Sequence, residues 1–171
     1  MSHQLKYGLI LGLINIVYTA AVFLIDYHLL QNPLFASVPF IVTVAILFVA
    51  GFELRKKNEG YLTFKNALVS TFVIYAIAAF MVVVYNILQY NVFTPEIAEE
   101  LQKNVLNQQV AVWESFGMSD EEIDAAAAEM QGKNMYGATW QLIGLAGNLV
   151  FGFILSLVVA AIVKKKEPEF S

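Results

Sequence analysis

The segment ATWQLIGLAGNLVFGFILSLVVAAIVKKK, residues 138–166, decides the fold class of this chain. Residues 138–163 are almost entirely apolar and carry no charge, and three lysines follow them directly. A helix rises 1.5 Å per residue, so about 20 mostly apolar residues suffice to cross the hydrocarbon core of a bilayer. The segment therefore predicts a transmembrane helix over residues 138–163.

Three further segments have the same character, at residues 7–25, 34–52 and 67–88. Hydrophobic residues make up 58% of the chain and charged residues 14%, whereas soluble domains have roughly 45–50% and about 25%. Lipid must cover part of so much apolar surface. We therefore predict an all-α, polytopic membrane protein. It is expected to form one membrane domain over residues 1–171, a bundle of four transmembrane helices with an extracytoplasmic helical hairpin between spans three and four.

The second span is the least regular of the four. Pro33 and Pro39 lie near its start, and a helix that began only at Val38 would be short for a bilayer. The first span has an alternative interpretation as a signal peptide, with Lys6 before it and small residues near its end. We favour a retained span because apolar sequence continues to Ile25.

The basic residues predict the orientation, because loops that stay in the cytoplasm retain lysine and arginine. Eight of the ten basic residues fall on one side of the membrane and only two, Lys103 and Lys133, on the other. The eight are Lys6, Arg55, Lys56, Lys57, Lys65, Lys164, Lys165 and Lys166. We expect a multi-pass protein of the inner (cytoplasmic) membrane, with both termini cytoplasmic and residues 89–137 outside.

The long loop, residues 89–137, is polar but patterned. Thr94-Pro95 predicts a helix start, and Gly117 can end that helix in the left-handed conformation. Ser119 with Glu122 three positions later forms a capping-box pattern for a second, shorter helix that stops near residue 132. The loop is thus expected to be a helical hairpin.

Trp113, Phe116 and Met118 make this hairpin a candidate surface for an envelope protein or a second copy of the chain, since aromatic residues and methionine are enriched at interfaces. The alternative is that they join the two helices or seat them on lipid, and we favour this alternative because any packed surface helix has an apolar stripe. The acidic residues of the loop lack the ligand spacing of an EF-hand, so no metal site is predicted.

The spans contain no Asp, Glu, Lys, Arg or His in their interiors, which disfavours an ion-coupled transporter. They carry small and polar residues at helical spacing instead, which we interpret as helix-packing surfaces. These residues are Gly8, Gly12, Asn15, Gly144, Asn148, Gly152 and Ser156. We expect Asn15 and Asn148 to share a hydrogen bond, or each to bond a neighbouring backbone group.

Nothing in the sequence predicts catalysis or a bound cofactor. There is no cysteine, and the two histidines, His3 and His28, fall on opposite sides in the predicted topology. No P-loop or catalytic-triad pattern is present, and no basic stripe with aromatics predicts nucleic-acid binding. We therefore expect a non-enzymatic membrane protein whose environment is the lipid bilayer. A subunit of a small-molecule transporter or channel is the first alternative and a membrane enzyme the second.

Two further strings carry a resemblance to a known family. They are Tyr7-Gly8-Leu9 at the first span and the sequence GYLTFKNA, residues 60–67, before the third. With the acidic helical insert and the glycine-rich last span ending in lysines, the chain resembles DUF4199, an uncharacterised bacterial family of small four-span membrane proteins. The resemblance implies the topology and carries no catalytic residue, because the family has no established activity.

Overall fold

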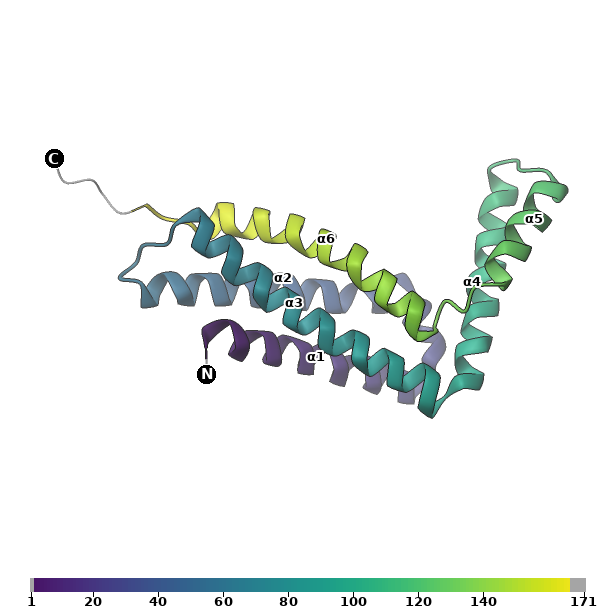
Figure 1. The fold of residues 1–171 in the computed structure, drawn as a ribbon, viewed down its shortest axis with the longest axis horizontal. Helices are drawn as coiled ribbons and strands as arrows, with labels where there is room; N and C mark the ends of the chain where they lie inside the picture. Colours follow the sequence, from purple (N-terminus) through teal and green to yellow (C-terminus); the bar gives the residue numbers. More distant parts are fainter. Residues whose placement is uncertain (1, 167–171) are drawn as a thin grey trace. The chain divides into compact units, whose positions relative to one another are not determined.

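The computed structural model describes residues 2–166, which are helical apart from turns and one isolated β-bridge (Figure 1). The elements in chain order are α1 (His3–Asp26), the 3₁₀ helix η1 (Tyr27–Gln31), α2 (Pro33–Lys57), α3 (Phe64–Leu88), the π-helical segment η2 (Gln89–Phe93), α4 (Pro95–Ser115), α5 (Asp120–Gln131) and α6 (Ala138–Val163).

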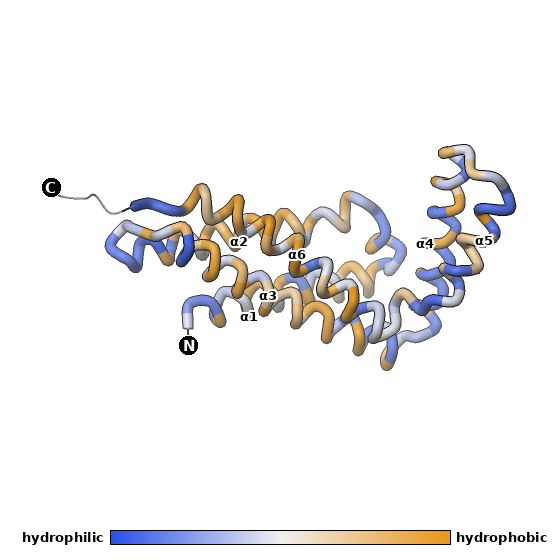
Figure 2. The backbone as a smooth tube through the Cα atoms, turned by 45° about the horizontal axis from the view of Figure 1, so that its top comes forward, coloured by the Kyte–Doolittle hydropathy of each residue, from blue (hydrophilic) through white to orange (hydrophobic). Residues whose placement is uncertain are grey.

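Four of these helices, α1, α2, α3 and α6, are long and apolar enough to cross a membrane by length and composition. Figure 2 shows apolar residues running along each of them, with polar residues gathered at their ends and in α4 and α5. The prediction of four spans is confirmed. The fourth span has the predicted bounds, whereas the first three helices extend several residues beyond them, as helices commonly do into the polar headgroup region.

Helix α2 begins at Pro33, not at Val38, and its 25 residues remove the concern about a short second span. Asn32 caps it, accepting a hydrogen bond from the backbone N–H of Leu34 at 3.0 Å. Pro39 lies inside the helix and, having no N–H, leaves the carbonyl of Phe35 without its usual partner four residues on. The Tyr18 hydroxyl of α1 donates to that carbonyl at 2.9 Å, so a neighbouring helix satisfies it.

The chain forms two compact units, each described here by itself. The first, called the bundle, comprises residues 2–83 and 145–166 of the described chain. The second, called the hairpin unit, comprises residues 84–144. Helices α3 and α6 contribute residues to both units.

The bundle has a small, tightly packed interior and an apolar exterior. Leu11, Leu47, Ile74 and Val159 are fully buried at its centre. Many large apolar side chains face outward instead, and Leu24 is 83% exposed. An outward-facing apolar surface of this extent fits a lipid environment.

The segments that the sequence places on the lysine- and arginine-rich side of the membrane lie together at one end of the bundle. The backbone of Leu62 exchanges two hydrogen bonds of 2.8 Å with that of Lys165, which joins the α2–α3 turn to the chain after α6. A ring nitrogen of His3 lies 2.9 Å from the carbonyl oxygen of Ala50, which joins the start of α1 to α2. All four spanning helices therefore begin or end together at this end, which we call the basic end.

Candidate functional site

Local signals in the sequence shape the α4–α5 hairpin as predicted. Pro95 is the first residue of α4, and the turn after the helix contains Gly117 at φ +77°, in the left-handed region where glycine is unstrained. Ser119 and Glu122 form a complete capping box at the start of α5. Thr94 occupies the capping position of α4, but its hydroxyl bonds the carbonyl oxygen of Gln89 at 3.0 Å instead of capping the helix.

The capping box also affects the ionisation of Glu122. The backbone N–H of Ser119 donates to the Glu122 carboxylate at 2.9 Å, and the Ser119 hydroxyl lies 2.9 Å from it as well. These hydrogen bonds stabilise the charged form and lower the pKa of Glu122 below its ordinary value. Glu129 has a lowered pKa for a related reason, since the Lys133 ammonium donates to it.

The three residues predicted as a partner surface lie together around the turn between α4 and α5. The backbone N–H of Met118 donates to the carbonyl of Trp113 at 3.2 Å, and both side chains are partly buried. Phe116 is 82% exposed, and Val112, one turn before it, is 43% exposed. Phe116 therefore does not join the two helices, and that part of the packing interpretation is wrong. Residues buried in the hairpin unit lie further from the turn, at Leu101 and Ile123.

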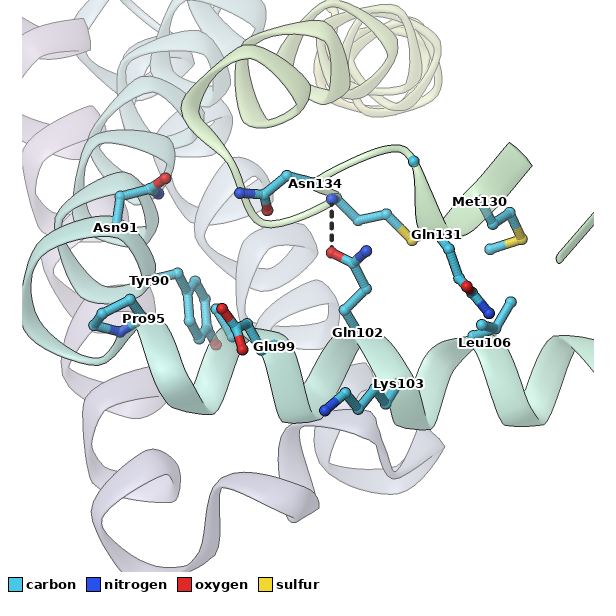
Figure 3. Close-up of a pocket in the computed structure, with 13 residues that line it drawn as sticks. Tyr90, Asn91, Pro95, Glu99, Gln102, Lys103, Leu106, Met130, Gln131 and Asn134 are labelled. Atoms are coloured by element: carbon cyan, nitrogen blue, oxygen red, sulfur yellow. Dashed lines mark hydrogen bonds between the residues drawn. The ribbon is translucent and has the colours of Figure 1, made fainter. Parts of the chain in front are cut away.

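A cavity of about 720 Å³ lies in the hairpin unit, between α4 and the segment that leads from α5 to α6 (Figure 3). Gln102 holds this segment: its amide N–H donates to the Lys133 carbonyl at 2.9 Å, and its amide oxygen accepts from the Met135 N–H at 3.1 Å. Cavity volumes of roughly 300–1,000 Å³ are typical of small-molecule sites. Its lining combines charged, amide and apolar groups, namely Tyr90, Asn91, Pro95, Ala98, Glu99, Gln102, Lys103, Leu106, Met130, Gln131, Gly132, Asn134 and Met135.

Sequence reasoning did not find this cavity. Its polar residues are scattered over α4 and a loop without any motif, and hydrophobic periodicity carries no information about a loop that folds back on a helix. The side-chain amide of Asn91 donates to the carbonyl of Tyr136 at 3.0 Å, and the ring of Tyr136 packs edge-on against Tyr90 at 4.8 Å. These contacts join residues some 45 positions apart, so only the tertiary structure reveals them.

The polar residues of the bundle have partners other than those predicted. The amide of Asn15 lies 3.4 Å from the Thr43 hydroxyl of α2, and the Tyr75 hydroxyl of α3 donates to the amide oxygen of Asn148 at 2.6 Å. The prediction that Asn15 and Asn148 bond each other or nearby backbone was therefore wrong. Each is bonded by a side chain of a neighbouring span instead, although the amide oxygen of Asn15 is buried without a hydrogen-bond partner among the described residues.

The predicted packing glycines divide into two groups. A Cβ added at Gly8 would lie 2.7 Å from Cβ of Ile77, and one at Gly12 would lie 2.6 Å from Sδ of Met81, so α1 and α3 approach closely here. Gly152 likewise faces the ring of Tyr75. Gly144, in the hairpin unit, has no atom within 4 Å of such a Cβ.

Ser156 is fully buried in the bundle. Within residues 2–166, no three His, Asp or Glu side chains are grouped so that they could hold a metal ion.

These features define an α-helical, multi-pass membrane protein that carries a helical hairpin between its third and fourth spanning helices. The chain belongs to the DUF4199 family of proteins of unknown function, whose sequence profile matches residues 6–165. Searches of curated proteins and of solved structures found no match.

Proposed function

We propose that this protein is a non-enzymatic component of a bacterial inner membrane that presents the α4–α5 hairpin outside the cytoplasm to bind an envelope protein. The observation that carries the proposal is the exposed Phe116 at the turn of the hairpin, beside Val112, Trp113 and Met118. Exposed aromatic side chains of this kind commonly anchor protein interfaces, because they bury much apolar area at low entropic cost.

The charge of the hairpin supports a partner with a basic surface. Residues 89–137 contain nine acidic residues and only two lysines, Lys103 and Lys133, which gives a net charge of −7. Complementary charge speeds encounter and selects among partners, while the apolar turn supplies contact area. A membrane of anionic lipid would repel the same surface, so the charge favours a protein over the bilayer as the occupant.

Site-specific photocrosslinking tests the proposal. A photoreactive amino acid at Phe116 should yield a discrete protein adduct in living cells, and the same group at Asn107, exposed on α4 away from the turn, should not. An adduct of twice the chain mass would identify a second copy as the partner. Adducts at Phe116 that contain lipid alone would contradict the proposal.

Cysteine labelling tests the proposed orientation, and because the sequence contains no cysteine, only the introduced residue can react. A Ser115→Cys variant should react with a membrane-impermeant thiol reagent in cells whose outer membrane is permeabilised, whereas Asn58→Cys should react only after lysis. Both positions are exposed in the structure, so burial cannot explain a difference. The reverse pattern would overturn the orientation.

The cavity beside α4 supports a second candidate function, capture of a small zwitterionic molecule. Glu99 and Lys103, on successive turns of α4, are both among its lining residues and supply one acidic and one basic side chain. Thermal stabilisation of the purified protein by free amino acids or dipeptides would support this function. Gly132→Trp, a substitution at a residue that lines the cavity, should abolish the stabilisation. A Cβ added at Gly132 has its nearest neighbour 3.7 Å away, so the backbone accommodates a side chain there.

A further inference from the structure

The basic end of the bundle carries an unusual concentration of positive charge. Eight lysine and arginine residues lie there or in the adjoining chain, against the glutamates Glu53 and Glu59 and, in the sequence after the described residues, Glu167 and Glu169. The net charge of these residues is +4. The hairpin, by contrast, has a net charge of −7.

Three of these cations are held around the end of α6. The Arg55 guanidinium donates to the carbonyl of Val163 at 3.3 Å, which fixes it against the last turn of the helix. The β-bridge from Leu62 to Lys165 fixes the backbone of the next two residues, Lys164 and Lys165. We call Arg55, Lys164 and Lys165 the basic cradle.

Each cation of the basic cradle lies over an aromatic ring. The Arg55 Cζ is 4.9 Å from the centroid of Phe52, the Lys164 Nζ is 5.6 Å from that of Phe64, and the Lys165 Nζ is 5.7 Å from that of Tyr61.

Apart from the one Arg55 N–H that bonds Val163, these contacts leave the N–H donors of the cations available. Within residues 2–166, no carboxylate forms a salt bridge with any of the three, whereas nearby Lys57 is paired with Glu53 at 2.7 Å.

The aromatic rings place the basic cradle at a particular depth. Tyrosine and tryptophan residues near the ends of spanning helices settle at the level of the lipid headgroups, and Tyr61 lies in the turn between α2 and α3. Lys165, held against Tyr61, and its neighbours in the basic cradle therefore lie at the level of the lipid phosphates, for which a guanidinium fork and lysine ammonium groups are suited donors. Basic pockets between spanning helices are a recognised way of binding anionic lipids.

We propose that the basic cradle, Arg55 with Lys164 and Lys165, is a binding site for the phosphate headgroup of an anionic phospholipid. The aromatic residues Phe52, Tyr61 and Phe64 position the cations, and the adjoining apolar surface of the bundle accepts the acyl chains. The inference does not depend on the partner of the hairpin, because it rests on contacts within the bundle alone.

The test measures lipid binding to the purified full-length protein by native mass spectrometry, with phosphatidylglycerol and phosphatidylcholine as the probes. The wild type should retain phosphatidylglycerol in preference to phosphatidylcholine. A Lys164→Gln/Lys165→Gln variant should bind phosphatidylglycerol about 10- to 30-fold more weakly, at about 1 kcal/mol per lysine near an anionic lipid surface. A Lys164→Arg/Lys165→Arg variant should keep the preference.

The matched control is Lys103→Gln/Lys133→Gln, which removes the same charge from the hairpin and should bind like the wild type. Circular dichroism of all variants verifies that they fold. Equal losses in the cradle and control variants, or equal binding of the two lipids by the wild type, would overturn the proposal. Displacement of the lipid by millimolar inorganic phosphate would also overturn it, since the site would then recognise phosphate and not a lipid.

Discussion

Replacement of Gly152 by alanine tests the contact that brings α3 and α6 together. A Cβ at this position would overlap the ring of Tyr75, approaching Cγ to 2.8 Å and two further ring carbons more closely still. Ordinary contact between carbon atoms is about 3.5–4.0 Å, so the nearest ring carbons must retreat by more than about 1 Å. Tyr75 is only 8% exposed, and its hydroxyl is engaged by Asn148, so it has little room to move.

The cost follows from two effects. Overpacking a well-packed interior typically costs about 1–3 kcal/mol. Displacing the ring also strains or breaks the hydrogen bond from Tyr75 to Asn148, and such bonds in membrane proteins average about 0.6 kcal/mol, with a maximum near 1.7. The higher helix propensity of alanine returns at most about 1 kcal/mol. Gly152→Ala should therefore lower the free energy of unfolding by about 1–3 kcal/mol.

Gly144→Ala is the matched control, because the same substitution on the same helix meets no atom within 4 Å. It should leave stability unchanged or raise it by up to about 1 kcal/mol. Unfolding of the purified variants in mixed micelles of mild detergent and dodecyl sulfate, followed by circular dichroism, measures the difference. In a Tyr75→Ala background Gly152→Ala should become nearly neutral. Equal effects of the two glycine substitutions, or no coupling to Tyr75, would refute the described contact.

Three further predictions concern other contacts. Gly8→Ala should destabilise the bundle by about 1–3 kcal/mol, because the added Cβ meets the branched Cβ of an isoleucine. Gly12→Ala should destabilise it by less, because its added Cβ meets a flexible thioether. The same unfolding assay ranks the two variants, and the opposite order would contradict the packing of α1 on α3. Asn148→Leu should also lower bundle stability, because the tyrosine hydroxyl on α3 loses its acceptor, and an unchanged unfolding midpoint would exclude this role. Ser119→Ala should destabilise the start of α5 by about 1 kcal/mol, which hydrogen exchange would show as roughly fivefold faster exchange of the amides there. The same variant should raise the pKa of Glu122 toward its ordinary value of 4.5, as measured by a carboxyl NMR titration. Because folding lowers the pKa of Glu122, the carboxylate stabilises the fold at a pH above its unfolded-state pKa, and this contribution is lost as the pH falls through the lower folded-state pKa. If the pKa of Glu122 does not respond to Ser119→Ala, the capping box is excluded as the cause of the lowered pKa.

The hairpin shows how far local sequence signals reach. Gly117 and the Ser119–Glu122 capping box act over three or four residues, and the structure has each where the sequence predicts it. The exposure of Phe116 was not predictable in this way, because a helical stripe does not reveal whether its last residue lies beyond the partner helix.

The hydrogen-bond partners inside the bundle show the same limit. The sequence indicates that Asn15 and Asn148 need partners, since an unpaired amide is costly in hydrocarbon. Which partner each finds depends on the order and rotation of the helices, and these place Thr43 beside one and Tyr75 beside the other. The Tyr18 hydroxyl that bonds the carbonyl left free by Pro39 is another partner set by helix arrangement.

The uncharged segments by themselves determined that this chain crosses a membrane four times, because hydrocarbon accepts only long apolar helices whose backbone groups are satisfied internally. The glycine turn after α4 and the capped start of α5 were likewise determined by local sequence signals. Only the tertiary structure decided that Gly152 and not Gly144 carries a helix contact, that a cavity lies beside Gln102, and that Arg55 joins Lys164 and Lys165 at one end. Each of these arises between residues distant in sequence, through packing and hydrogen bonds that no periodic pattern along one helix encodes.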